Sequence, residues 1–516
     1  MNGAQSLITS LVGAGVDVCF MNPGTSEMHF VQALDAVPDM RGVLALYEGV
    51  ATGAADGYAR ITGRPAAVLL HLGPGLGNGM ANLHNARRAR SPVLCVVGAH
   101  ATDHVRYDAP LQSDIPALAG TVSGWVHTSG TTRAVAADAM RALEATGHGG
   151  GQVATLVLPA DVSWSDGGRT ARPRPVPGPS PVDGSALDDT AAALDLGGPT
   201  ALLLGGAALS ERGLRAASRI SRATGARLLA ERFAARTEQG AGVPTVPRLA
   251  YLAEQVRPQL AGVTTLVLAG APSPVAFFAY PGTESDLVPE GCRVLEPADA
   301  GQDVVAALES LADRLAAGVE PELAPLDPPD PEPGALTVRS LGAALAATLP
   351  HGAVVVDESI TSGGGLTALA TAQRHSLLTL TGGAIGQGLP VATGAAVAAP
   401  GRPVVTVEAD GSALYTIQAL WTQARERLDV TTVVVNNAAY AILRGELART
   451  GAGATAERAE RMLDLRDPTT DFTAISRGFG VPAERVTTSE ELVAALRKAY
   501  AEPGPHLVEA IVPPVA

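Results

Sequence analysis

Residues 404–440 read VVTVEADGSALYTIQALWTQARERLDVTTVVVNNAAY. The β-branched run Val404–Val407 predicts a strand, Ser412–Leu428 has apolar residues at helical spacing, and Thr431–Val435 predicts a second strand. A right-handed strand, helix, strand unit makes the two strands parallel. The stretch therefore predicts an open α/β sheet, and such sheets bind ligands beyond the carboxyl ends of their strands.

Polar residues lie at this predicted carboxyl edge. Asp410 follows the first strand and Asn437 follows the second. A carboxylate and an amide oxygen make a partial shell for Mg²⁺, which commonly completes its octahedron with phosphate and water. Gly411 and the predicted helix start at Ser412 would offer backbone N–H groups to that phosphate. Alone, each half of the pattern could instead be a helix cap or a turn.

A second turn rich in hydroxyl groups follows another predicted strand. In the stretch VVVDESITSG, residues 354–363, the side chains of Ser359, Thr361 and Ser362 could reach a diphosphate. They could equally cap a helix, so this turn stays open between the two interpretations.

An isolated carboxylate ends a strand near the N-terminus. The predicted strand Gly42–Tyr47 runs directly into Glu48, which is followed by a helix rich in glycine and alanine. Between Leu46 and Val50 this side chain should have little contact with solvent, which suits a proton-handling group. The alternative is a buried glutamate whose hydrogen bonds are satisfied by the backbone.

Histidines end other predicted strands of the same region. His71 closes the strand after Glu48, and His100 and His104 follow a later one. A single histidine at a strand end is often structural, but several polar residues at one carboxyl edge indicate a site.

Two proline-rich stretches divide the chain. Residues 167–185 and 318–334 read as linkers, because proline removes donors and favours extended backbone. The predicted blocks are 1–166, 186–317 and 335–516, each with strands alternating with helices, which indicates three consecutive α/β domains with mainly parallel sheets. The sequence VATGAA occurs at 50–55 and again at 391–396, which favours related outer domains around a different middle one.

Composition excludes several classes of function. The 516 residues carry 37 Lys and Arg against 51 Asp and Glu, a net charge of −14, so binding to nucleic acid or anionic lipid is not expected. No apolar run reaches the roughly 18 residues that span a bilayer. We expect no membrane association.

Lysine and cysteine usage narrow the chemistry further. Lys498 is the single lysine, so the chain has no Walker A lysine, and a Schiff-base lysine would have to lie in an ordinary surface helix. Three separated cysteines, Cys19, Cys95 and Cys292, suit reduced core thiols. With no basic leader and cleavage site visible, we expect a cytoplasmic protein.

The whole pattern resembles a known superfamily. A glutamate ending a strand in one α/β domain, with Asp-Gly-Ser and Asn-Asn in another, is similar to the thiamine diphosphate enzymes that include benzoylformate decarboxylase and the acetolactate synthase large subunit. The resemblance implies a pyrimidine-binding domain, a Rossmann-like middle domain and a diphosphate-binding domain in that order. One departure is Ala409, which replaces the first glycine of the family's Gly-Asp-Gly.

The resemblance also implies roles for particular residues. Glu48 would bond N1′ of the aminopyrimidine, and Thr25 and His71 would touch the substrate. The implied Mg²⁺ ligands are Asp410, Asn437 and the carbonyl of Ala439. The remaining implied cofactor contacts are Gly383, whose carbonyl holds the 4′-amino group, Ile385, the apolar wedge that bends the cofactor, and Thr361, Ser362, Gly411, Ser412 and Tyr440.

The implied reaction is decarboxylation of a 2-oxo acid through a C2 ylid of thiamine diphosphate and an enamine. A homodimer or homotetramer with sites between subunits is also implied, and Phe277 and Phe278 could shape an apolar pocket. An acetolactate synthase-like carboligase is the alternative. Phe277 stands near the family's second catalytic histidine, and Ala99 and Ala160 stand where acetolactate synthases have glutamine and lysine.

Two other classes of protein are weighed against this one. A flavin-dependent oxidase would use the turn GGAALSERG at 205–213, which is too ordinary to indicate FAD. A binding subunit without activity is disfavoured because Glu48, Asp410 and Asn437 are all present.

Overall fold

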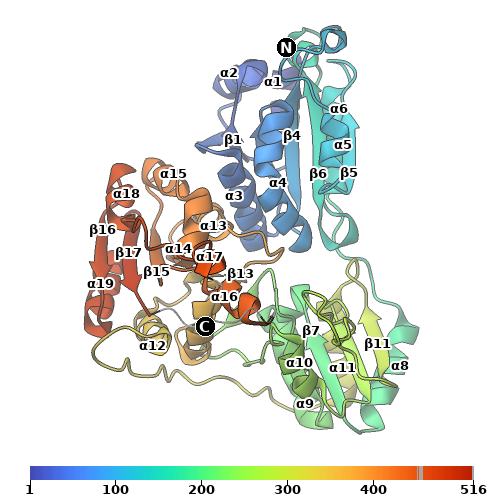
Figure 1. The fold of residues 1–516 in the computed structure, drawn as a ribbon. Coiled ribbons are helices and arrows are strands. Elements are labelled where there is room, and N and C mark those ends of the chain that lie inside the picture. Colours follow the sequence, from blue (N-terminus) through green and yellow to red (C-terminus); the bar gives the residue numbers. More distant parts are fainter. Residues whose placement is uncertain (450, 452–456, 514–516) are drawn as a thin grey trace. The chain divides into compact units, whose positions relative to one another are not determined.

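The chain folds into two compact units that combine helices with mainly parallel sheets (Figure 1). The computed structural model describes residues 1–449, 451 and 457–513. The first unit comprises residues 1–177, 329–368 and 380–516, and the second comprises residues 178–328 and 369–379. The predicted α/β class is confirmed.

The N-terminal sheet is the first of two sheets in the first unit. It has six parallel strands in the order β2-β1-β3-β4-β6-β5. Its strands are β1 (Val18–Asn22), β2 (Arg41–Leu44), β3 (Ala66–Leu70), β4 (Val93–Ala99), β5 (Trp125–Thr128) and β6 (Val153–Pro159). Strands β3 and β6 are buried along their whole length, which explains why they read as continuous apolar runs.

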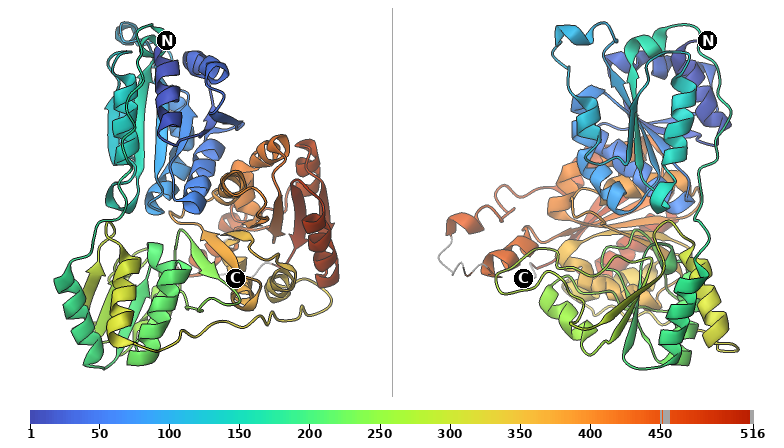
Figure 2. Two further views of the ribbon diagram at one scale, coloured as in Figure 1. Left: turned by 180° about the vertical axis from the view of Figure 1, so that it is seen from behind. Right: turned by 90° about the vertical axis from the view of Figure 1, so that its right-hand side faces the viewer.

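Helices pack on this sheet as Figure 2 shows from two sides. They are α1 (Gly3–Gly13), α2 (Met28–Ala36), α3 (Glu48–Thr62), α4 (Leu72–Arg88), α5 (Ile115–Ala119), α6 (Val135–Ala145) and α7 (Ala160–Trp164). Apolar side chains of α1, α2 and α6 form one buried core with strand residues.

The C-terminal sheet belongs to the same unit. Five parallel strands lie in the order β16-β17-β15-β14-β12. They are β12 (Val354–Glu358), β14 (Val404–Ala409), β15 (Val430–Asn436), β16 (Ala483–Val486) and β17 (His506–Ile511). The helices here are α12 (Val338–Thr348), α13 (Gly388–Ala398), α14 (Asp410–Thr416), α15 (Ala419–Glu426), α16 (Ala441–Arg449), α17 (Glu457–Glu460), α18 (Phe472–Gly478) and α19 (Ser489–Ala501).

The two sheets share one strand order. The neighbours β1-β3-β4-β6-β5 match β12-β14-β15-β17-β16, and α3 precedes β3 just as α13 precedes β14. The repeated VATGAA lies in α3 and in α13. This topology supports the inference that the two outer parts of the chain are related.

The two repeated helices pack directly against each other through glycine. A Cβ atom added at Gly394 of α13 would lie 1.8 Å from the carbonyl oxygen of Ala54 in α3. A Cβ at Gly57 would lie 2.1 Å from the carbonyl oxygen of Val391. Only residues without side chains allow the two backbones to approach this closely.

The second unit contains a smaller parallel sheet in the order β11-β10-β7-β8. Its strands are β7 (Thr200–Leu204), β8 (Arg227–Ala230), β10 (Thr265–Ala269) and β11 (Arg293–Ala298). Its helices are α8 (Gly184–Asp195), α9 (Glu211–Thr224), α10 (Ala253–Leu260) and α11 (Val304–Leu315). An antiparallel pair, β9 (Thr237–Gln239) and β13 (His375–Thr379), also lies in this unit.

Two local expectations were wrong. The predicted helix Ser412–Leu428 is two helices, α14 and α15, and the first begins at Asp410 itself. The strand predicted at Gly42–Tyr47 is shorter, because β2 ends at Leu44 and Glu48 becomes the first residue of α3.

Among the described residues, none of the helices combines the length and the apolar composition needed to span a membrane.

Candidate active site

The residues predicted to bind a metal ion lie where β14 and β15 end. Asp410 is 3% exposed, and its two carboxylate oxygens accept hydrogen bonds from the backbone N–H groups of Gly411, at 2.8 Å, and Ala438, at 2.6 Å. The side-chain oxygen of Asn437 accepts from the N–H of Ala439 at 3.0 Å. The structure therefore brings Asp410, at the end of β14, next to the turn after β15 that contains Asn437 and Ala439, as the sequence predicts.

The residues of this turn fit a divalent cation. Burial raises the pKa of the Asp410 carboxyl above its ordinary value, although several backbone N–H groups, that of Gly411 foremost, act in the opposite direction. A cation next to this carboxylate would relieve that cost. Since Asp410 would be the one charged ligand, the set suits Mg²⁺ completed by phosphate oxygens.

Tyr440 packs over the start of α14. A Cβ added at Gly411 would lie 2.4 Å from the Tyr440 ring, so glycine is required at this position for the ring to lie there. Ser412 is buried in the first turn of the same helix. Ala438 has a positive φ of 54°, a conformation that favours glycine, at the point where the chain turns between Asn437 and Ala439.

A buried glutamate holds the loop that contains Gly383 and Ile385. We call residues 381–388 the 381–388 loop. Glu358, at the end of β12, accepts hydrogen bonds from the backbone N–H groups of Gly386, at 2.7 Å, and Gly388. Gly383 has a φ of +78° and is exposed, so its carbonyl is accessible to a ligand. Sequence reasoning missed the role of Glu358, which no local motif indicates.

The hydroxyl-rich turn lies directly after β12. Ser359 donates its hydroxyl to Asp357 at 2.6 Å, which fits the local-capping interpretation. Thr361 and Ser362 follow at the start of the 3₁₀ segment 360–371, with Ser362 buried. The structure places both at the same sheet edge as Asp410, because β12 and β14 are neighbours.

Glu48 lies at the first position of α3, where it is buried. The amide nitrogen of Asn78 donates to its Oε2 at 3.0 Å. A Cβ at Gly75 would lie 3.0 Å from its Oε1, so α4 closes over the carboxylate. One carboxyl oxygen is thus fixed by an amide.

His71 is held by a carboxylate that sequence reasoning missed. Its Nδ1 lies 2.7 Å from Oε2 of Glu27, which is 1% exposed and also accepts from the Gly24 N–H at 2.8 Å and the Ser26 hydroxyl at 2.8 Å. Thr25 is exposed beside this pair. A buried acid bound to Nδ1 orients the imidazole and directs Nε2 outward. The pair is 44 residues apart in the sequence, so spacing could not reveal it.

Other candidate residues form separate clusters. The rings of His100 and His104 lie 5.4 Å apart, and His104 lies 5.6 Å from Tyr107. In the second unit Phe277 contacts Phe278, with ring centroids 4.7 Å apart. Both phenylalanines are partly exposed.

Two buried glutamates lie side by side near the ends of β12 and β14. Glu358 and Glu408 occupy paired positions on β12 and β14. Burial raises the pKa of Glu358 to about 7, although the N–H groups of Gly388 and Gly386 oppose this rise. Burial, and then the charge of Glu358, raises the pKa of Glu408 well above its ordinary value. Both shifts favour the protonated carboxyl over the carboxylate.

Two family models and several proteins of known sequence match this chain. Residues 1–119 match the model of the thiamine pyrophosphate enzyme N-terminal TPP binding domain, and residues 364–510 match its C-terminal TPP binding domain. The chain is 59% identical to a Mycobacterium tuberculosis protein provisionally named acetolactate synthase large subunit, over 99% of both chains. It is 30% identical to benzoylformate decarboxylase of Pseudomonas aeruginosa, over 96% of both.

A solved structure with the same fold also comes from a thiamine diphosphate-dependent enzyme. A thiamine diphosphate-dependent 4-hydroxybenzoylformate decarboxylase from Rhodococcus jostii superimposes with a TM-score of 0.88 and 25% identity, covering 99% of each chain. The chain belongs to the thiamine pyrophosphate enzyme family.

The glutamate pair predicts a dependence of stability on pH. Unfolded glutamates titrate near pH 4.5, so between that pH and the raised folded values the native state binds more protons than the unfolded state. The free energy of unfolding contributed by the pair therefore falls as pH rises through about 7. Glu408→Gln should raise the thermal midpoint at pH 8.5 and flatten its fall between pH 5.5 and 8.5, measured by calorimetry without ligands.

The exposed Glu290→Gln serves as the control and should retain the pH dependence of the wild-type protein. Parallel pH profiles for wild type and Glu408→Gln would contradict the raised pKa of the buried pair.

The Glu27 contact predicts the tautomer of His71. With a carboxylate at Nδ1, that nitrogen carries a proton in the native protein. In Glu27→Ala the ring should move toward the Nε2–H tautomer, visible in long-range ¹H–¹⁵N spectra of the imidazole. The signals of His506, whose Nδ1 faces the Gly504 carbonyl, should not change. An unchanged His71 pattern in the variant would contradict the assignment.

Proposed function

We propose that this protein decarboxylates a 2-oxo acid with thiamine diphosphate and Mg²⁺. One observation carries the proposal: a buried carboxylate, Asp410, and a buried amide, Asn437, lie at the ends of the adjacent strands β14 and β15, with the Ala438 N–H bonded to Asp410. The 30% identity to a benzoylformate decarboxylase and the structural similarity to a 4-hydroxybenzoylformate decarboxylase support the decarboxylase assignment over the full chain.

Asp410, Asn437 and the Ala439 carbonyl would hold the metal, and Thr361, Ser362, Gly411 and Ser412 would contact the diphosphate. Gly383 and Tyr440 would contribute a carbonyl and a ring to the cofactor site, and Ile385 an apolar support. When bound, the thiazolium group supplies the electron sink for loss of CO₂.

The side chains of the N-terminal sheet would handle the proton and the substrate. Asn78 fixes Oε2 of Glu48, so Oε1 can exchange a proton with the aminopyrimidine. His71, oriented by Glu27, presents Nε2 to the substrate, and Thr25 adds a hydroxyl. We propose a homodimer or homotetramer in the cytoplasm, in which, as the family resemblance implies, Glu48 of one subunit would face Asp410 and Asn437 of another.

The direct test is turnover. Purified protein with thiamine diphosphate and Mg²⁺ is incubated with a panel of 2-oxo acids, including benzoylformate and pyruvate, while CO₂ is measured. Release from at least one acid is expected. No release from any of them would refute the decarboxylase assignment.

A second candidate is acyl transfer to another carbonyl. It is favoured by the 59% identity to a protein named after acetolactate synthase. Analysis of products from pyruvate, alone and with an added aldehyde, separates the two reactions, because a carboligase yields acyloins.

Glu48→Gln should separate cofactor binding from proton transfer. The amide keeps the shape of the side chain but cannot exchange the proton, so cofactor affinity should stay near the wild-type value. Exchange of the cofactor's C2 proton should slow by about 100-fold or more, measured by NMR after quenching in deuterated buffer. Normal exchange in this variant would contradict the role of Glu48.

Asp410→Asn should weaken the binding of Mg²⁺ in the presence of thiamine diphosphate. The change removes the one charged ligand of the proposed set, so Mg²⁺ affinity in the presence of thiamine diphosphate should fall by about 100-fold or more. Calorimetric titration measures this affinity. Asp429→Asn, which alters an exposed carboxylate that accepts the Gly504 N–H, is the matched control. Equal Mg²⁺ affinity in both variants would contradict the site.

A further inference from the structure

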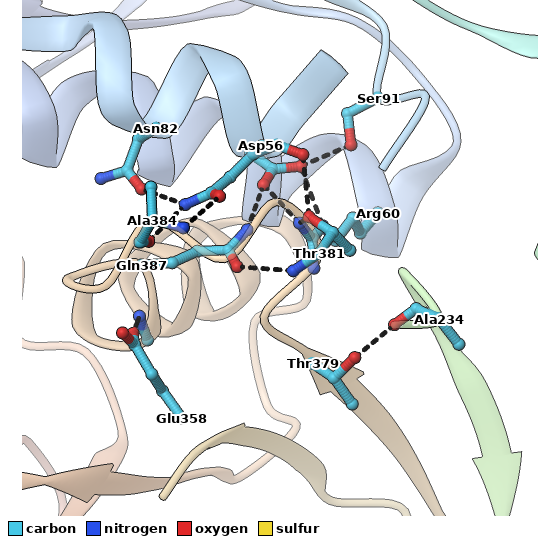
Figure 3. A network of polar contacts seen from close by, with 12 residues as sticks. Asp56, Arg60, Asn82, Ser91, Ala234, Glu358, Thr379, Thr381, Ala384 and Gln387 are labelled. Atoms are coloured by element: carbon cyan, nitrogen blue, oxygen red, sulfur yellow. Dashed lines mark hydrogen bonds and ion pairs between the residues drawn. The ribbon is translucent and has the colours of Figure 1, made fainter. Parts of the chain in front are cut away.

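Two asparagines on one face of α4 contact the 381–388 loop: Asn82, which is labelled in Figure 3, and Asn85. Asn82 is 2% exposed and Asn85 is fully buried. They stand three residues apart, so one turn of α4 presents both side chains in the same direction. The family's metal and proton motifs include neither residue.

Asn82 links the start of α3 to the 381–388 loop. Its amide nitrogen donates to the carbonyl of Gly49 at 2.8 Å and to the carbonyl of Gly386 at 3.2 Å. Gly49 directly follows Glu48, and Gly386 directly follows Ile385. A single side chain therefore bonds the backbone next to Glu48 and the backbone next to Ile385, which in the proposed assembly serve two different sites.

Asn85 bonds both backbone polar groups of one loop residue, Ala384. Its amide nitrogen donates to the Ala384 carbonyl at 2.8 Å, and its amide oxygen accepts from the Ala384 N–H at 3.3 Å. It also donates to the side-chain oxygen of Asn82 at 3.1 Å, and its carbonyl accepts from the Thr381 hydroxyl at 2.8 Å. The loop residue between Gly383 and Ile385 is thus fixed by α4.

A buried ion pair anchors the end of the loop. Asp56 and Arg60 of α3 form an ion pair at 2.6 Å with side chains 0% and 1% exposed. Gln387 donates to Asp56 at 2.8 Å, and Arg60 donates to the Thr381 hydroxyl at 2.9 Å (Figure 3). Because Glu358 at the end of β12 also accepts from Gly386 and Gly388, the loop is bonded from helices α3 and α4 on one side and from the C-terminal sheet on the other.

We propose that Asn82 and Asn85 are positioning residues for cofactor binding. Their hydrogen bonds fix the backbone of the 381–388 loop relative to the first turn of α3, and so fix the positions of the Gly383 carbonyl and the Ile385 side chain. The buried amides suit this task, because each satisfies several backbone groups that would otherwise lose hydrogen bonds in the interior. The inference rests on the proposed function for the roles of Gly383 and Ile385.

The test compares two buried amides. Asn82→Leu removes the donors to Gly49 and Gly386 at similar volume. Gln423→Leu is the control, because Gln423 is fully buried and its amide donates to α13, to the Thr393 hydroxyl at 3.0 Å and the Leu389 carbonyl at 3.4 Å, instead of to residues 381–388. Amide hydrogen exchange of the ligand-free proteins is followed in peptides covering 381–388. Asn82→Leu should speed exchange there about tenfold relative to wild type and to the control.

Cofactor affinity gives the second readout. Calorimetric titration with thiamine diphosphate and Mg²⁺ should show affinity at least about tenfold weaker in Asn82→Leu and nearly unchanged in Gln423→Leu. If Asn82→Leu does not fold, Asn82→Ala replaces it and is judged by the same two measurements.

Equal loop exchange in the Asn82 variant and the control would overturn the proposal, even if both lose thermal stability. Faster exchange with unchanged cofactor affinity would also overturn it, because the loop would then not position the cofactor. If wild-type protein binds no thiamine diphosphate, the proposed function fails, whereas the exchange comparison still tests whether Asn82 holds the loop.

Discussion

The close approach of α3 and α13 is the constraint on which the first unit depends. Gly57 and Gly394 let each helix backbone touch a carbonyl of the other, where any side chain would collide with backbone atoms. This contact brings α4 near enough for Asn82 and Asn85 to reach the 381–388 loop. Backbone atoms cannot move aside as a flexible side chain can, so α3 and α13 pack at one distance. The polar network between α4 and the 381–388 loop depends on that distance.

Because the two sheets share one strand order, the turns after β3 and after β14 are equivalent, but they carry different side chains. His71 follows β3, and Asp410 follows the equivalent strand β14. One turn presents an imidazole bonded to a buried acid, and the other presents a carboxylate surrounded by backbone N–H groups. The same strand-to-helix geometry thus presents an imidazole in one copy and a carboxylate in the other, the groups to which we assign proton chemistry and cation binding in the proposed function.

The parts of the site that follow a strand directly could be predicted. Asp410 and Asn437 were placed correctly because parallel strands end at one edge, and that rule needs only the strand pattern. Glu27 was missed because its partner is distant in sequence. The break between α14 and α15 was missed because the apolar spacing continues through Ile417, which caps the first helix.

The sequence by itself determined the α/β class, the two related outer parts and the residues at the strand ends. These follow from hydrophobic period and chain order, which are local quantities. Only the tertiary structure decided which buried acid serves which group: Glu27 for His71, Glu358 for the 381–388 loop and Asp56 for Arg60 and Gln387. Such pairings depend on which backbones come within hydrogen-bonding distance, and that distance is set by helix packing, not by position along the chain.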